Sequence, residues 1–248
     1  GDQITKVNNK QIQTIQELMN ELRQTNELLL ISSAGTKEIK LNEEQVSQLR
    51  PFLKDVAEGV GTLTYIDPQT MEYGALGHQI IDESTKKMPN YREGNVFSVE
   101  ISQIKKSKPG QPGYKIAQLL ENVRGSVTHN ELYGVFGVWK ESLDESLHQP
   151  MEIMHEKDIL IGPAQILTSL KSDEIKTFSI EIQEVTDGII QFKVDDKELI
   201  KETGGIIQGM SGSPIIQNNK FIGAVTHMYV EQPVNGAGLA LLEMLEKR

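Results

Sequence analysis

The sequence has 248 residues, of which 38% are hydrophobic and 24% charged, with a formal net charge of −10 and no cysteine. The negative charge argues against binding nucleic acid or an anionic membrane through a basic surface, because phosphates are contacted chiefly by Lys and Arg. The lack of cysteine excludes disulfides, thiolate catalysis and cysteine zinc sites. No run of roughly 18 or more apolar residues predicts a membrane span. Because the chain starts at Gly1-Asp2 without a methionine, we expect a fragment that follows a signal or a membrane anchor.

Residues 1–48 have the pattern of a small separate module. Thr14 and Glu17 match a capping box, and the apolar residues that follow recur at helical spacing. They predict a helix over Thr14–Thr25, followed by strands at Glu27–Ser32 and Thr36–Leu41. The opening Gly-Asp-x-Ile-x-x-Val-Asn, the helix and the two strands resemble the second half of a PDZ domain, a family in which a peptide adds as a strand beside the helix. The family's carboxylate-binding loop would precede Gly1, so the module is partial. The alternative is a cap packed on the next domain.

Charged residues and Pro51 make 42–56 the expected linker, and we place the domain boundaries at 1–48, 49–58 and 59–248. From residue 59 onward the chain consists of short β-rich runs separated by turns. Tyr114–Asn122 could be a strand or a short helix. The other runs are Val60–Ile66, Tyr73–Ile81, Val96–Ile104, Tyr133–Trp139, Ala164–Leu170, Thr177–Val185 and Ile189–Val194. With the hairpin below, this makes about ten or more strands, which is typical of a sandwich or closed barrels.

A glycine-flanked serine lies between two apolar runs at residues 204–227. A nucleophilic serine needs a tight turn that exposes its oxygen, with backbone N–H groups aimed at the developing oxyanion. Gly209, Gly212 and Pro214 around Ser211 meet this need. Ile215-Ile216, the Asn-Asn-Lys turn and Phe221–Thr226 predict a supporting hairpin. The pattern Gly-x-Ser-Gly-x-Pro before a hairpin resembles the nucleophile loop of chymotrypsin-like serine peptidases, although a hairpin without chemistry would also explain it.

A serine hydroxyl requires a base, usually histidine. His78 follows Gly74-Ala75-Leu76-Gly77 at the end of a β-rich run, where small residues allow close approach to another segment, and it is our candidate base. His227 ends the hairpin strand that would run beside a substrate, so it is expected to line the cleft or to be structural. The remaining histidines lie in polar stretches and are expected at the surface: His129, His148 and His155.

The base in turn needs a carboxylate to hold its tautomer. Asp195 and Asp196 lie just before the Gly204-Gly205 turn. If the pair is extended, its side chains point to opposite faces, and at most one of them can face the histidine. The residues alone do not choose between the two.

Taken together, these motifs resemble the SpoIVB peptidase family of endospore-forming bacteria, PDZ-bearing serine peptidases of chymotrypsin-like type. The resemblance covers nearly the whole chain and is most specific from Thr203 to His227. It implies a chymotrypsin-like double β-barrel at 59–248, preceded by the partial PDZ-like module. It also implies a triad of Ser211, His78 and Asp196, which provisionally selects one aspartate.

The resemblance implies a cellular role as well. Members are made in the developing spore, cross the inner forespore membrane, cleave themselves and then cut a membrane-anchored regulator of an intramembrane protease, which activates a late sigma factor. The expected location is therefore extracytoplasmic, between the forespore and mother-cell membranes. Two features depart from ordinary chymotrypsin-like enzymes. An acid only fifteen residues before the serine is unusual. Met210 stands where many trypsin relatives carry an aspartate that pairs with a newly formed N-terminus.

We therefore expect a serine endopeptidase in which Ser211 attacks the peptide carbonyl, His78 transfers the proton and Asp196 orients His78. The backbone N–H groups of Gly209 and Ser211 would bind the oxyanion. The candidate substrate-binding residues are Gly205, Thr226 and His227. Since Thr203-Gly204-Gly205 contains no acid, no preference for Lys or Arg is expected, and neither a metal nor a cofactor is expected. The alternative is a non-catalytic PDZ and peptidase-like adaptor that binds protein partners.

Overall fold

The computed structural model describes residues 4, 6–7, 10–23, 27–32, 35–82, 86–89, 93–143, 149–171 and 174–246. The chain divides into two compact units. The N-terminal unit comprises Gly1–Glu58 together with Asp82–Lys87, and the second unit comprises Gly59–Ile81 and Met88–Arg248. No helix in the described ranges is long and apolar enough to cross a bilayer.

The N-terminal unit combines short strands with two helices around a small core. Thr14 caps the first helix by accepting a hydrogen bond from the backbone N–H of Glu17. The core consists of Val7, Leu18, Leu22 and Val46. The elements in chain order are β1 (Lys6–Val7), β2 (Lys10–Gln11), α1 (Ile15–Leu22), β3 (Glu27–Ser32), β4 (Gly35–Lys40), α2 (Glu43–Leu49) and the 3-10 helix η1 (Arg50–Phe52). β1 pairs with β2, and β3 pairs with β4.

Helix α2 corrects the prediction that 42–56 is a linker throughout. Asn42 and Gln45 form a complete capping box, in which the side-chain oxygen of each residue accepts a hydrogen bond from the backbone N–H of the other. The buried side chain of Val46 anchors the helix to the core. Glu43 and Glu44 are exposed on this helix, whereas Lys54 and Asp55 belong to the segment after η1, which lacks regular structure.

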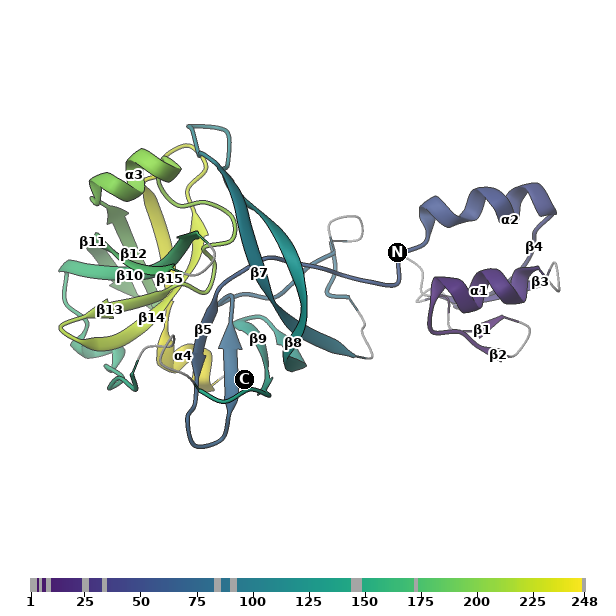
Figure 1. Cartoon of the computed structure of the whole chain (residues 1–248), viewed down its shortest axis with the longest axis horizontal. Coiled ribbons are helices and arrows are strands. Elements are labelled where there is room, and N and C mark those ends of the chain that lie inside the picture. Colours follow the sequence, from purple (N-terminus) through teal and green to yellow (C-terminus); the bar gives the residue numbers. More distant parts are fainter. Residues whose placement is uncertain are drawn as a thin grey trace. The chain divides into compact units, whose positions relative to one another are not determined.

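The second unit contains a closed six-stranded barrel, with strand order β10-β11-β12-β15-β14-β13 (Figure 1). Pairing of β10 with β13 through Gln165–Ile216 and Ile166–Ile215 closes it. The strands are β10 (Gly162–Lys171), β11 (Glu174–Thr186), β12 (Ile189–Val194), β13 (Pro214–Gln217), β14 (Lys220–Met228) and β15 (Asn235–Ala240). In β11, Phe178, Ile180 and Ile182 alternate into the buried core while their neighbours face solvent, as the period of two requires.

The other half of this unit is a five-stranded sheet with the order β5-β6-β9-β8-β7. Its strands are β5 (Leu63–Ile66), β6 (Glu72–Ala75), β7 (Gly94–Lys105), β8 (Tyr114–Glu131) and β9 (Gly134–Trp139). The mainly β prediction is confirmed, with the difference that this half is an open sheet beside one closed barrel. The ambiguous Tyr114–Asn122 run is the first part of the long strand β8, which pairs with β7 through several register shifts.

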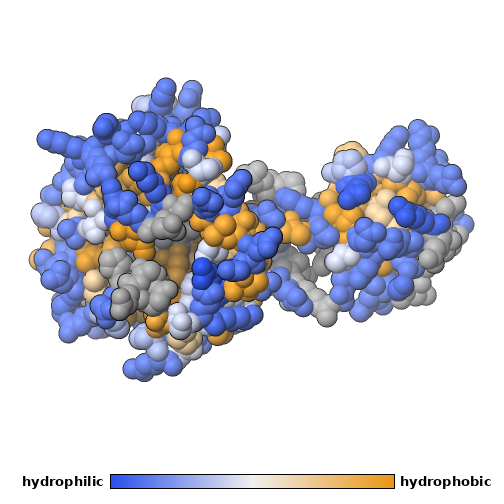
Figure 2. All heavy atoms as spheres, viewed as in Figure 1, coloured by the Kyte–Doolittle hydropathy of each residue, from blue (hydrophilic) through white to orange (hydrophobic). Residues whose placement is uncertain are grey.

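Three short helices complete the unit, namely the 3-10 helix η2 (Glu156–Asp158), α3 (Lys197–Thr203) and α4 (Leu241–Glu246). The sequence patterns did not predict helices α3 and α4 or strand β15. Hydrophilic residues cover most of the face seen in Figure 2, with smaller apolar areas between them.

Candidate active site

The nucleophile loop connects the end of α3 to the start of β13. Gly209 and Gly212 have positive φ angles of 95° and 91°. A Cβ atom at Gly212 would lie 2.1 Å from the carbonyl oxygen of Thr62, so only glycine fits there. Ser211 is partly exposed at this turn, whereas Ser213 is fully buried. Of the two serines in the motif, Ser211 is the one that a substrate can reach.

Strand β14 lies directly beside Ser211. The Ser211 hydroxyl donates a hydrogen bond to the carbonyl oxygen of Thr226 at 3.2 Å. The backbone N–H of the next residue, Gly212, donates to the carbonyl oxygen of Val225 at 2.7 Å. These bonds hold the serine loop against the strand that was expected to run beside a substrate.

His78 reaches the same part of β14 from the five-stranded sheet. β6 ends at Ala75, earlier than predicted, because Leu76 and Gly77 have φ angles of 69° and 68° and turn the chain. A Cβ atom at Gly77 would lie 2.7 Å from Cγ2 of Thr226, so this turn packs on β14. The ring of His78 then contacts the ring of His227, with centroids 5.9 Å apart. Ser211 therefore contacts Thr226, and His78 contacts the next residue of β14, His227.

The hydrogen bonds of His78 suit a general base. Its Nδ1 lies 2.9 Å from the carbonyl oxygen of Gln79. A proton on Nδ1 would donate to this oxygen and leave Nε2 free to accept a proton. In His227, partial burial, and secondarily the neighbouring His78, lowers the pKa. The imidazole of His227 therefore favours its neutral form beside the candidate base.

Two of the other histidines, His129 and His155, lie at the surface, in agreement with the prediction. His148 lies outside the described residues.

The two candidate acids lie on the barrel at the start of α3. Asp196 caps this helix, with Oδ1 accepting from the Leu199 N–H at 2.9 Å and Oδ2 accepting from the Ser179 N–H at 3.3 Å. Asp195 accepts from the Ser179 hydroxyl at 2.6 Å. Among the residues that the structure describes, neither aspartate is hydrogen-bonded to His78. The pair lies between the end of β12 at Val194 and the start of α3 at Lys197, and the backbone of Asp196 is still extended.

The candidate oxyanion donors have free N–H groups. The Gln208 carbonyl accepts from the Lys115 N–H at 3.1 Å, which turns the N–H of the same peptide group, that of Gly209, the opposite way. Within the described chain, the backbone N–H groups of Gly209 and Ser211 donate to no protein acceptor. Two unpaired N–H groups two residues apart on a tight turn can receive a developing negative charge.

Lys115 supports this loop with its side chain as well. Its Cδ and Cγ atoms lie 3.0 and 3.3 Å from the position that a Cβ atom of Gly209 would occupy. Its ammonium group donates to the hydroxyl of Thr168 at 3.1 Å. Burial lowers the pKa of Lys115 to about 8. The aliphatic part of the Lys115 side chain therefore packs against Gly209, two residues before Ser211.

A cavity of about 210 Å³ opens beside Ser211. Its walls are mostly apolar and contain no Asp, Glu, Lys or Arg among the described residues. The lining residues are Pro112, Ile206, Ile207, Gln208, Ser211, Val225, Thr226, His227, Met228 and Val230. Two of the three candidate substrate-binding residues, Thr226 and His227, line it. Gly205 does not line it, and a Cβ atom there would lie 2.2 Å from the Pro233 carbonyl oxygen, so this glycine serves a close backbone contact.

Sequence reasoning missed two residues that hold the site in place. Thr62 donates from Oγ1 to the Gly209 carbonyl oxygen at 2.9 Å and from its N–H to the Ser211 carbonyl oxygen at 2.8 Å. Asn130 accepts from the Ile80 N–H at 2.8 Å and donates to the Ile80 carbonyl oxygen at 3.0 Å, two residues after His78. No local sequence motif marks either residue, because each one bonds to a residue at least 50 positions away in the sequence.

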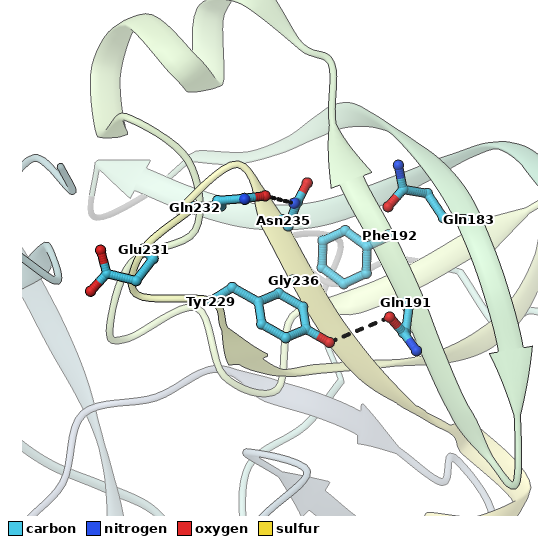
Figure 3. A pocket seen from close by; sticks show the side chains of 8 residues that line it. All are labelled: Gln183, Gln191, Phe192, Tyr229, Glu231, Gln232, Asn235 and Gly236. Carbon is cyan, nitrogen blue, oxygen red and sulfur yellow. Dashed lines mark hydrogen bonds between the residues drawn. The ribbon is translucent and has the colours of Figure 1, made fainter. Parts of the chain in front are cut away.

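A second cavity of about 350 Å³ lies between β12, β15 and the loop after β14 (Figure 3). Amide side chains surround Phe192 there, and the Tyr229 hydroxyl approaches Gln191 at 3.5 Å. It shares no lining residue with the cavity at Ser211.

Comparison with known families decides the assignment. The model of the SpoIVB peptidase S55 family matches residues 46–245, which is most of the chain. The chain belongs to the SpoIVB peptidase S55 family. It is therefore a serine peptidase, a hydrolase whose substrate is a protein, and the matched range contains Ser211, His78 and Asp196. Membership of a peptidase family disfavours the alternative that this S55 peptidase is a non-catalytic adaptor.

Two further comparisons add little to this assignment. Among solved structures, the S55 peptidase resembles the Rv3671c protease of M. tuberculosis in an inactive form, with 14% identity, coverage of 53% of this chain and 69% of that chain, and a TM-score of 0.38. It also resembles the scabies mite inactivated protease paralogue S-D1, with 11% identity, coverage of 77% and 96%, and a TM-score of 0.36. Similarity at this level does not bear on the activity of this chain. A search of curated proteins finds no match.

Proposed function

We propose that this S55 peptidase cleaves peptide bonds through an acyl-enzyme on Ser211, with His78 as general base and then general acid. The observation that carries the proposal is that Ser211 and His78 contact neighbouring residues of β14, Thr226 and His227 respectively. Nε2 of His78 would take the hydroxyl proton as the oxygen attacks the substrate carbonyl, and would return it to the leaving amine.

The oxyanion of the tetrahedral intermediate would be bound by the backbone N–H groups of Gly209 and Ser211. Their lack of protein acceptors supports this role. In comparable sites, removing one such donor costs roughly 3 to 4 kcal/mol of transition-state stabilisation.

Asp196 enters the proposal as the acid through the family resemblance. Its carboxylate accepts two backbone N–H bonds in this structure, so orienting His78 would require it to exchange at least one of them. Catalytic hydrogen bonds often tighten only in the substrate complex. Capping needs only a side-chain oxygen that accepts a hydrogen bond, whereas orienting His78 needs a charged carboxylate. Mutation can therefore separate the two roles.

We further propose that the enzyme acts in sporulation signalling. Family membership supports self-cleavage followed by a cut in a membrane-anchored regulator of an intramembrane protease, which leads to activation of a late sigma factor. This role places the enzyme outside the cytoplasm, in the space between the forespore and mother-cell membranes, with a signal or anchor upstream of Gly1. The N-terminal unit would act as a partial PDZ module that binds peptide.

Labelling by a fluorophosphonate probe tests the catalytic proposal, because the probe reacts only with an activated serine. We expect the wild-type protein to be labelled, and Ser211→Ala and His78→Ala to lose labelling and peptide hydrolysis by roughly 10⁴-fold or more. His155→Ala, at an exposed histidine, is the matched control and should retain both. Full labelling of Ser211→Ala, with a circular dichroism spectrum like that of wild type, would remove this serine from the role. A folded wild-type protein that no probe labels would favour the adaptor.

A further inference from the structure

Thr62 holds the loop that carries the oxyanion donors from outside that loop. Thr62 lies immediately before β5, about 150 positions from the loop, and its hydroxyl donates to the Gly209 carbonyl oxygen at 2.9 Å. Its backbone N–H donates to the Ser211 carbonyl oxygen at 2.8 Å, and its carbonyl oxygen accepts from the Leu76 N–H at 3.2 Å. One residue therefore contacts the loop on both sides of Met210 and also the turn that leads to His78.

These bonds define the orientation of the peptide groups around the nucleophile. A trans peptide group is rigid, so fixing its carbonyl oxygen also fixes the direction of its N–H group. The Gln208 carbonyl is held by the Lys115 N–H, and the Gly209 carbonyl is held by the Thr62 hydroxyl, so the two peptide groups that flank Gly209 are both anchored. With a φ of 95°, Gly209 has no side chain that would resist rotation of an unanchored peptide group.

We propose that Thr62 is a positioning residue for the oxyanion hole. Its hydroxyl holds the Gly209–Met210 peptide group, which lies between the two oxyanion donors, so that rotation of this group does not turn the N–H groups of Gly209 and Ser211 away from the substrate oxygen. The inference rests on the proposed function of Ser211 and goes beyond it by assigning a residue from the other half of the unit to the orientation of the loop. Thr62 touches no reacting atom and acts only through the loop.

The same strand offers a matched control. Thr64 lies two residues further on in β5, is 4% exposed, and its hydroxyl has no hydrogen-bond partner in the described structure. Replacing a threonine by valine preserves the shape of the side chain and removes only the hydroxyl. At Thr64 this change should be neutral or stabilising, because it removes a buried unpaired polar group. At Thr62 it leaves the Gly209 carbonyl without its donor.

The test compares Thr62→Val, Thr62→Ser and Thr64→Val with wild type. We expect Thr62→Val to lower kcat on an apolar peptide substrate roughly 10- to 100-fold with KM within about 2-fold, since misplaced transition-state donors affect kcat rather than ground-state binding. The affinity for a peptide boronate, which forms a tetrahedral adduct with the serine, should fall by a similar factor. Thr62→Ser retains the hydroxyl and should restore kcat, while Thr64→Val should match wild type.

Three outcomes would overturn the proposal. The first is wild-type kcat and boronate affinity in Thr62→Val with an unchanged Tm. The second is a loss that Thr62→Ser does not restore. If Thr62→Val does not fold, Thr62→Ala replaces it, and failure of both to fold would assign the hydroxyl to the fold rather than to the loop. Failure of the proposed function is distinguished by the wild-type protein, which would then neither hydrolyse peptide nor bind the boronate covalently.

Discussion

At the scale of single residues, the structure separates side chains that meet at Ser211 from one that does not. Ser211 contacts Thr226 and His78 contacts the adjacent His227, both on β14. Asp196 instead satisfies the N-terminus of α3, where an Asp side chain accepts an otherwise unpaired N–H. A carboxylate at a helix N-terminus is explained by capping alone, so its catalytic role needs a test that keeps the cap.

Asparagine provides this test, because it caps helices about as well as aspartate but carries no charge. If Asp196 orients His78 as proposed, Asp196→Asn should lower kcat by roughly 10⁴-fold while Tm stays within a few degrees. Asp196→Ala should additionally lower the free energy of unfolding by about 1 kcal/mol. Thermal unfolding and peptide hydrolysis on both variants separate the effects. Activity of Asp196→Asn within a few-fold of wild type would leave Asp196 with the capping role alone.

Lys115 leads to a prediction on the pH dependence of stability. Burial lowers its pKa to about 8 from the usual 10.5. Between these values the unfolded chain binds a proton that the folded protein lacks, so stability rises with pH across this window. Below about pH 8 the folded protein bears the cost of a buried ammonium group.

Lys115→Met keeps the stem against Gly209 and removes the charge. Relative to wild type, the stability of this variant should decrease by on the order of 1–3 kcal/mol between pH 7 and pH 10, because only wild type gains from deprotonation. Chemical denaturation at the two pH values measures this difference. Lys193→Met, at an exposed position on β12, is the control and should follow the wild-type pH dependence. A parallel pH dependence for Lys115→Met would contradict the prediction.

At the scale of elements, β14 and the nucleophile loop together form the cavity beside Ser211. Apolar side chains dominate its walls, and no described Asp or Glu lines it to pair with a basic substrate residue. A charged side chain placed there would lose its hydration without gaining a partner. The cavity therefore favours an apolar residue on the acyl side of the cut.

A peptide series with one varied position tests this preference. We expect kcat/KM for norleucine or leucine at the position before the cut to exceed that for lysine by at least about 100-fold. Norleucine and lysine share a straight aliphatic stem, so their ratio isolates the effect of the charge. Cleavage of a peptide library mainly after Lys or Arg would refute the assignment of this cavity.

Elements with a strong local period were predicted well, and those without one were not. β12 was predicted at Ile189–Val194, its observed bounds, because its alternation of apolar and polar residues shows half-burial directly. Helix α3 was not predicted, because it is only seven residues long and its single buried apolar position, Leu199, shows no helical period. The range of β8 was too short because its later half alternates weakly and is broken by register shifts.

At the scale of the whole molecule, the chain forms two units with separate cores, and each unit is built from two separate segments of the sequence. The chain leaves the N-terminal unit after Glu58 and contributes Asp82–Lys87 to it again, directly downstream of the His78 turn. The ion pair between Lys54 and Asp82 at 2.8 Å joins the two parts of this unit. A cut at residue 58 would therefore leave one segment of the N-terminal unit attached to the peptidase unit.

The sequence by itself determined the local features of this protein: the capped helix α1, the strand-rich character after residue 59, the glycine turn around Ser211 and the short list of histidines from which His78 came. Only the tertiary structure decided which residues meet. The anchoring of the loop by Thr62, the packing of Lys115 on Gly209 and the hydrogen bonds between Asn130 and Ile80 were outside its reach. The physical reason is that strands and helices leave a period in neighbouring residues, whereas hydrogen bonds between segments 50 to 150 positions apart leave none.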